Sequence, residues 1–342
     1  MPKKRIIYFD LLNIAACLAM IFLHCNSMVH TYVPGKNWML ALVIEVAFFW
    51  AVPVFLMLSG ANLMRYRDRY DTKTFLKKRF VRTFIPFVFW SVALYIWYYG
   101  RGASDAFGIA QFYELFMTNG IESIYWFFFP LFALYLAMPA LSLLADHKRV
   151  LLYLAVTAFV LQSCASPICL MLGLSWNSYI SQPMVTTFIF YAIVGYLVST
   201  TDISKRGRMV IYVCGIAALV FRYAYIYITS STAGTINRIL FDCTYFTAVM
   251  PALALFVWFK YHNFDAIEKS PRATSVLARL SGCTLGVYLM HYVILRSVVF
   301  ETLAIPATSI ALRIIGPFVL YAICVCITLI IKKIPVLKYI VP

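Results

Sequence analysis

Charged residues are scarce in this sequence: only 12% of its 342 residues are Asp, Glu, Lys or Arg, whereas 63% are hydrophobic. A soluble domain is nearer half apolar and a quarter charged. The composition therefore excludes an ordinary soluble protein and indicates an integral membrane protein. Aromatic residues make up 17% of the chain, as expected where tryptophan and tyrosine lie at the membrane surfaces.

Signals of several other protein classes are also lacking. The nine cysteines show no regular spacing, and Cys324 and Cys326 would point to different faces of a helix, so neither a disulfide framework nor a metal site is predicted. The first apolar run is too long for a signal peptide and lacks a small-residue cleavage site, so we expect this helix to stay in the mature protein. No internal repeat of the transporter type is visible.

The hydrophobic residues form long runs separated by short loops. Runs of the usual length of about 20 residues predict about ten membrane-spanning helices. They cover residues 7–27, 38–63, 84–100, 124–145, 150–172, 183–201, 208–229, 240–260, 283–300 and 310–331. No room remains for a separate soluble domain. We therefore predict one all-α transmembrane domain over residues 1–342, in the lipid bilayer of the cell membrane.

The basic residues behind the net charge of +16 lie mainly between these runs. If the N-terminus is cytoplasmic, the inward-facing segments hold most of the 29 lysines and arginines, whereas the outward loops hold only Lys36, Arg101 and Arg238. Cytoplasmic loops of membrane proteins carry such an excess. The charge thus indicates topology rather than nucleic-acid binding, and both termini are predicted to be cytoplasmic.

The run Tyr8–Ser27 carries Asp10, Asn13 and His24 along an otherwise apolar helix. At about 100° per residue, His24 falls roughly 20° from Asn13 and roughly 40° from Asp10, so the three form one narrow stripe. Asn13 and His24 would lie about 16 Å apart along the helix axis. Because ionisable groups are costly within a bilayer, His24 is a candidate functional residue. The alternative is that it merely ends an anchor helix at the outer surface.

The second run places Glu45 at the same predicted depth as His24, in the outer third of the membrane. If the two helices touch, the Glu45 carboxylate would fix the tautomer of the imidazole and raise its basicity. Pro53 should kink the same helix and free a carbonyl group. Ser59 and Gly60 permit close approach by a ligand or by another helix, and helix packing is the favoured interpretation.

Arg79 and Arg82 stand three residues apart in the basic inner segment and would share one face of a helix. Guanidinium groups bind phosphate through paired donors, so this pair is a candidate site for an anionic cosubstrate. The alternative is a charge cluster that contacts anionic lipid, which explains most of the basic residues of this loop.

Other polar residues within the apolar runs have simpler interpretations. We expect His291 to be a structural residue bonded to a neighbouring helix, and Glu122 to be a solvated loop carboxylate. Three embedded arginines either line a cavity for a polar acceptor or pair with Glu301 and Asp242; they are Arg222, Arg296 and Arg313.

Six segments in this order, with about ten spans, resemble the acyltransferase 3 family of multispanning membrane acyltransferases. The resemblance covers most of the chain and is strongest in the first 145 residues. The segments are YFDLLNIAACLAMIFLH (8–24), AVPVFLMLSG (51–60), KKRFVRTFIP (77–86), YWFFFPLFALYLAMP (125–139), FYAIVGYLV (190–198) and LGVYLMH (285–291).

The resemblance implies acyl-CoA as donor and a cell-envelope glycan or a similar hydroxylated molecule as acceptor. His24 matches the family's catalytic histidine, and Arg79 and Arg82 match an arginine pair associated with the donor. The family's first-helix arginine is Asn13 here. Its charge must then come from elsewhere, for which Arg5 is a candidate, or else the substrate differs or activity is lost.

We therefore hypothesise an O-acyl transfer, expected to be an acetyl transfer from acetyl-CoA. In this hypothesis, His24 is the general base or a transient acyl carrier, and Glu45 orients His24. The acyl donor is bound by Arg79, Arg82 and Asn13. Donor and base would be roughly 20–27 Å apart, which requires a pore or a relay. A transporter or flippase of a lipid-linked sugar is the main alternative, and an inactive scaffold is a third. Binding or hydrolysis of acyl-CoA distinguishes the enzyme from the transporter.

Overall fold

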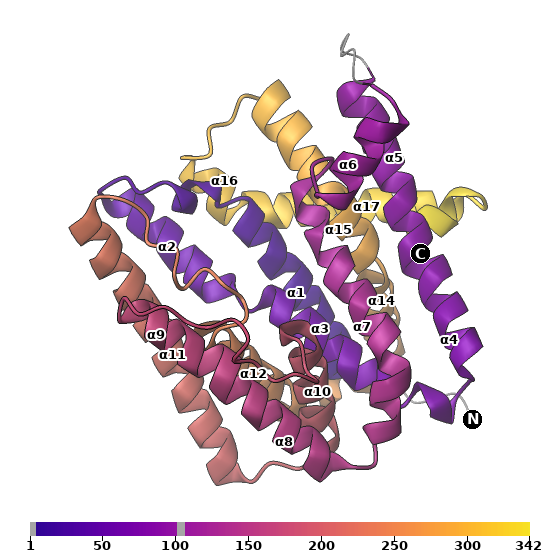
Figure 1. Ribbon diagram of the computed structural model, residues 1–342. Helices are drawn as coiled ribbons and strands as arrows, with labels where there is room; N and C mark the ends of the chain where they lie inside the picture. The colour runs from indigo at the N-terminus through magenta and orange to yellow at the C-terminus, as the bar shows by residue number, and fades with distance from the viewer. Residues whose placement is uncertain (1–4, 101–106) are drawn as a thin grey trace.

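The computed structural model describes residues 5–100 and 107–342, which form helices joined by turns and short loops, with no β-strand in those ranges (Figure 1). Lys3, Lys4 and Arg101, which enter the topology prediction, lie outside the described residues. Three π-helical segments, Phe80–Phe84, Phe159–Ala165 and Leu295–Thr302, continue neighbouring α-helices. The α-helices are α1 (Ile7–His24), α2 (Lys36–Phe48), α3 (Ala51–Leu63), α4 (Thr72–Arg79), α5 (Ile85–Tyr99), α6 (Ile109–Met117), α7 (Phe128–Leu141), α8 (Lys148–Ala158), α9 (Ser166–Met171), α10 (Thr187–Thr200), α11 (Lys205–Ala233), α12 (Phe246–Tyr261), α13 (Asp265–Glu268), α14 (Pro271–Gly282), α15 (Thr284–Ile294), α16 (Ile310–Ile314) and α17 (Gly316–Lys333).

Within the described ranges, eight helical runs are long and apolar enough to cross a membrane. Two shorter apolar helices, Phe188–Thr200 and Phe246–Tyr261, occupy the sixth and eighth of the predicted runs. Each apolar run of the sequence thus corresponds to one helix or to consecutive helical segments, in the same order. The prediction of an all-helical, multispanning membrane protein is confirmed.

Helix α1 lies in the middle of the bundle and packs against α2, α3, α12, α14, α15 and α17 (Figure 1). Its first half supplies Phe9 and Leu12 to one buried apolar cluster, and its second half supplies Cys17 and Ile21 to another. Because protein surrounds α1 on most sides, its polar residues face other helices rather than lipid, as expected of functional groups in a membrane.

The kink predicted at Pro53 is a break between two helices. Helix α2 ends at Phe48 and α3 begins at Ala51, just before the proline. Proline has no N–H, so it cannot bond the carbonyl of Phe49 four residues earlier. The break leaves the Phe49 ring under the buried Arg222 of α11, whose Cζ lies 3.4 Å from the ring centroid.

Helices α3 and α10 pack backbone to backbone through two glycines. A Cβ on Gly60 would lie 1.9 Å from the carbonyl oxygen of Ala192, and a Cβ on Gly195 would lie 2.0 Å from that of Met57. Gly60 therefore serves helix packing, as favoured from the sequence. This close contact fixes α3, whose opposite residues face the cavity described below.

The two ends of the described chain lie on the same side of the bundle. Arg5 and Pro342 line one cavity, and the indole Nε1 of Trp90 donates to the carbonyl of Ile340 at 3.0 Å. A shared side requires an even number of membrane crossings, which the predicted ten spans satisfy. That this side is cytoplasmic stays a prediction from the lysine and arginine distribution.

Candidate functional site

A cavity of about 600 Å³ lies at the end of the bundle that holds both termini. Its walls come from the start of α1, the end of α3, the end of α4, the first half of α7 and the junction of α14 with α15. Small-molecule sites typically occupy roughly 300–1,000 Å³. The cavity is therefore large enough for a ligand of cofactor size.

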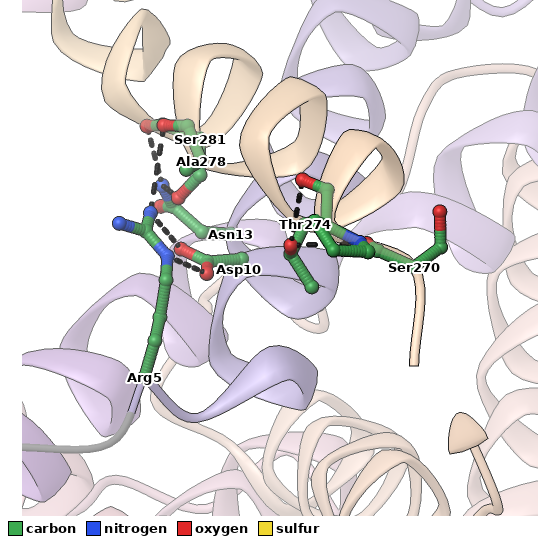
Figure 2. A network of polar contacts seen from close by, with 8 residues as sticks. Arg5, Asp10, Asn13, Ser270, Thr274, Ala278 and Ser281 are labelled. Atoms are coloured by element: carbon green, nitrogen blue, oxygen red, sulfur yellow. Dashed lines mark hydrogen bonds and ion pairs between the residues drawn. The ribbon is translucent and has the colours of Figure 1, made fainter. Parts of the chain in front are cut away.

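An ion pair at the start of α1 forms part of one wall (Figure 2). The Nη2 of Arg5 donates to Oδ1 of Asp10 at 2.8 Å, and its Nε also donates to this buried carboxylate. The hydrogen bond to Asp10 raises the pKa of the Arg5 guanidinium above its ordinary value. Nη2 also reaches the carbonyl of Ala278 on α14 at 3.4 Å. Arg5 thus brings a permanent charge to the place where α1 meets α14.

Asn13 joins α1 to the junction of α14 with α15. Its Nδ2 donates to the carbonyl oxygen of Ser281 at 3.0 Å and to the Ser281 Oγ at 3.1 Å (Figure 2). It also donates to the Thr284 Oγ1 at 2.9 Å. Asn13 lines the cavity, as does Asp10 one turn earlier. The amide supplies hydrogen bonds where the family motif has a charge, and Arg5 supplies a charge beside it.

Two further arginines line the cavity. Arg69 donates from Nη2 to the carbonyl of Asn62 at 2.7 Å. Arg79, at the end of α4, is half-buried, with its Cζ 5.8 Å from the centroid of the Tyr135 ring. Its Nε is buried without a hydrogen-bond partner among the described residues. With Arg5, these residues give the cavity three cationic side chains against one acidic side chain, Asp10, so the side-chain field favours an anionic ligand.

Arg82 does not share the position of Arg79. It is exposed and is absent from the cavity wall, whereas Arg79 lines it. The prediction that the two share one face assumed a continuous α-helix. Instead, the chain passes into a π-helical segment at Phe80, where the wider turn changes the angle between residues three apart. Of the predicted pair, only Arg79 lines the cavity, and a role for Arg82 with the donor stays a prediction.

The other end of the cavity is aromatic. Phe127, Phe128 and Tyr288 line it, and the Tyr288 hydroxyl donates to the carbonyl of Ile124. The ring centroids of Tyr288 and Phe128 are 5.4 Å apart. The cavity is thus cationic at one end and apolar at the other, which suits a ligand with a charged part and a neutral arm.

His24 lies at the far end of α1, outside the cavity wall. Its ring centroid is 5.1 Å from that of His291 and 5.5 Å from that of Tyr292, both on α15. His291 in turn lies 5.9 Å from the Tyr288 ring. Aromatic rings therefore connect the apolar end of the cavity to His24.

The structure does not pair Glu45 with His24. Glu45 is buried on the face of α2 that packs against α11, and among the described residues its polar neighbours are Asn26 and Arg222. Depth in the membrane was predictable from residue counting, but the rotation of α2 about its axis was not. The expected direct orientation of His24 by Glu45 is therefore corrected; a catalytic role for either residue is a separate prediction.

The other embedded charges are mostly structural. The Nε of Arg296 donates to Oε1 of Glu301 at 3.2 Å, which is one of the two pairings predicted as alternatives to a cavity. The Nη1 of Arg313 donates to the carbonyl of Asn37 at 3.0 Å. Glu122 is buried rather than solvated, and it accepts from the Tyr98 hydroxyl at 3.2 Å.

Sequence reasoning missed several cavity residues. Arg69 was one charge among many in a basic loop, and no signal separated it from those that face lipid headgroups. Phe127 and Phe128 stand in a long apolar run, where no signal separated them from residues that face lipid. Ser281 and Thr284 carried a usable signal, because they are polar, three residues apart and at the start of an apolar run.

Together, the helical bundle and its arginine-lined cavity define a multispanning membrane protein with a candidate ligand site. A family model described as an acyltransferase domain matches residues 6–332, nearly the whole chain. The chain therefore belongs to the acyltransferase 3 family, and this membership supports membrane acyltransferase activity. No curated protein and no solved structure matches the chain.

Proposed function

We propose that the protein transfers an acyl group, expected to be acetyl, from acyl-CoA to a hydroxyl of a cell-envelope glycan or a related acceptor across the cell membrane. The observation that carries this proposal is the cavity, in which Arg5, Arg69 and Arg79 surround one end and aromatic side chains the other. Acyl-CoA has the same division into an anionic nucleotide and a neutral pantetheine arm.

The donor's phosphates would lie against the three arginines. Guanidinium groups bind phosphate oxygens through two parallel donors, and the buried, unpaired Nε of Arg79 provides such a donor. Asn13 would hold the α14–α15 junction and so the shape of the site. On the predicted topology this end faces the cytoplasm, where acyl-CoA is found.

The pantetheine arm would extend along Phe127 and Phe128 towards Tyr288. His291 lies one helical turn beyond Tyr288, a rise of about 4.5 Å, and His24 is its neighbour. This arrangement supports a route in which the arm spans part of the roughly 20–27 Å between the donor's phosphates and His24, with the rings of Tyr288 and His291 between the thioester and His24.

His24 would act as general base. Its unprotonated ring nitrogen takes the proton of the acceptor hydroxyl while the oxygen attacks the thioester carbonyl. The acceptor O–C bond forms, the C–S bond breaks, and the proton passes to the CoA thiolate. The products are the acylated acceptor and free CoA. A positioned base of this kind contributes about 10²–10⁴-fold in rate.

Donor binding by the purified protein tests the proposal and separates an acyltransferase from a transporter. We expect acetyl-CoA to bind and Arg79→Ala to weaken binding about 10- to 100-fold, because a hydrogen bond to a charged group contributes about 1.5–3 kcal/mol. Isothermal titration calorimetry in detergent measures this affinity. Arg149→Ala, which removes an exposed arginine outside the cavity, is the matched control and should bind normally. No binding by the wild type, or equal losses in both variants, contradicts the assignment.

A further inference from the structure

His291 is fully buried in α15 and bonded on one side only. Its Nδ1 lies 3.1 Å from the carbonyl oxygen of Val287 and 2.8 Å from that of Tyr288, both on its own helix rather than on a neighbouring one. A carbonyl oxygen only accepts, so Nδ1 must carry the hydrogen. In the neutral ring, Nε2 is then the nitrogen with the free lone pair.

The Nε2 of His291 has no hydrogen-bond partner among the described residues, although it is buried. Buried polar atoms are nearly always satisfied, so one left unpaired calls for a functional explanation. The nearest ring that can supply a donor is His24, at a centroid separation of 5.1 Å, closer than Tyr288 at 5.9 Å and Tyr292 at 6.4 Å. A linear N–H···N bond of ordinary length places two imidazole centroids about 5 Å apart. At this separation, rotation of the His24 ring would complete the bond.

We propose that His291 is a positioning residue for His24: its Nε2 accepts the N–H of His24 and so directs the other nitrogen of His24 towards the acceptor hydroxyl. This inference rests on the proposed acyl transfer. During the reaction His24 takes one proton from the hydroxyl, and the lone pair of His291 stabilises the resulting imidazolium. The proton then leaves His24 for the CoA thiolate. His291 itself keeps its Nδ1 hydrogen throughout, so no further reactant is required.

Two substitutions separate this role from a purely structural one. In His291→Asn, the amide nitrogen can take the place of Nδ1 and keep the bonds to the carbonyls, but no acceptor remains at the position of Nε2. In His291→Gln, the longer side chain places an amide oxygen near the position of Nε2 and gives up the bonds to the backbone. A positioning residue should tolerate Gln better than Asn, and a structural residue should show the reverse order.

The test measures thiol release from acetyl-CoA by purified protein, with polysaccharide extracted from the envelope of a deletion strain as acceptor. We expect His291→Asn to lower kcat at least about tenfold, part of the effect of a positioned base, with the KM for acetyl-CoA unchanged. His291→Gln should recover part of this loss. In a His24→Ala background, His291→Asn should have no further effect, because the two act as a unit. His147→Asn, at an exposed histidine, is the control.

The outcomes distinguish the inference from the function on which it rests. Normal kcat in His291→Asn, with active wild type, overturns the role of His291 and leaves the acyltransferase intact. Loss in His291→Gln alone, with a lowered unfolding temperature, shows a structural role and also overturns it. No thiol release by the wild type refutes the proposed function and, with it, the role of His291.

Discussion

Polar side chains inside this bundle differ in how their burial is compensated. Asn13 donates to two neighbouring side chains and one carbonyl, and Asp10 is paired with Arg5. Such groups fix the contact between helices because leaving any partner unsatisfied costs about 1–3 kcal/mol. Other buried polar atoms have no hydrogen-bond partner among the described residues, and two of them, the Nε of Arg79 and the Nε2 of His291, bear on the proposed reaction. Each faces a place where the proposed reaction needs a donor or an acceptor.

The effect of burying one carboxylate on the stability of the protein can be tested at Glu122. Burial raises its pKa above the ordinary value of 4.5, so the folded protein binds this proton more tightly than the unfolded chain does. Stability from this group is fully present below pH 4.5 and is lost as pH rises through the raised pKa. Glu122→Gln keeps an acceptor for Tyr98 and has no charge to bury. We expect it to unfold at a higher temperature than the wild type at about pH 8, and at a similar temperature at about pH 4.

The measurement is thermal unfolding in detergent across this pH range. Glu114→Gln, at an exposed carboxylate on α6, is the control. A Glu122→Gln variant that is less stable at about pH 8, or whose difference from the wild type does not vary with pH, contradicts the explanation.

At the scale of elements, the contact of α3 with α10 sets the position of the cavity wall. A methyl group at residue 195 would meet the backbone of Met57 at 2.0 Å, which no rotamer change relieves. Gly195→Ala should therefore destabilise the protein by about 1–3 kcal/mol or more and weaken acetyl-CoA binding. The Cβ of Gly108→Ala meets nothing within 4 Å, so this variant is the control. Equal unfolding temperatures for the two variants would show that the helices are not in close contact.

Some features of the elements follow from sequence and others do not. The apolar runs predict every spanning helix in order, because a membrane segment must bury its backbone within one helix. Pro53 predicts its break for a similarly local reason. The π-helical turn after Arg79 and the rotation of Glu45 towards Arg222 depend on packing between distant segments. The periodicity of a single helix therefore could not predict the position of Arg82 or of Glu45.

The whole molecule combines a cationic cavity at one end with a histidine pair deeper in the bundle. From the sequence, His24 and Arg79 could be selected as candidates, because charges in a membrane are costly and the family segments contain them. Their relation could not be derived: the path through Tyr288 and His291 is formed by α15, more than 260 residues after the start of α1. Only the folded chain brings these side chains together.

Orientation in the membrane can be tested with fusions at the C-terminus. The cavity and both ends of the described chain share one side of the bundle, so the proposal that acyl-CoA binds there requires this side to be cytoplasmic. We expect a fused green fluorescent protein to fluoresce in a bacterial host and a fused alkaline phosphatase to be inactive. Active phosphatase would place the cavity outside the cell, away from acyl-CoA, and contradict the proposed reaction.

Transfer of labelled acetyl groups by purified His24→Ala protein tests the central claim most directly. The wild type should move the acetyl group of acetyl-CoA to a base-labile position on envelope polysaccharide. We predict that His24→Ala lowers this rate about 10²-fold or more while it binds acetyl-CoA with unchanged affinity, because His24 lies outside the donor cavity. Transfer by His24→Ala at the wild-type rate would contradict the account.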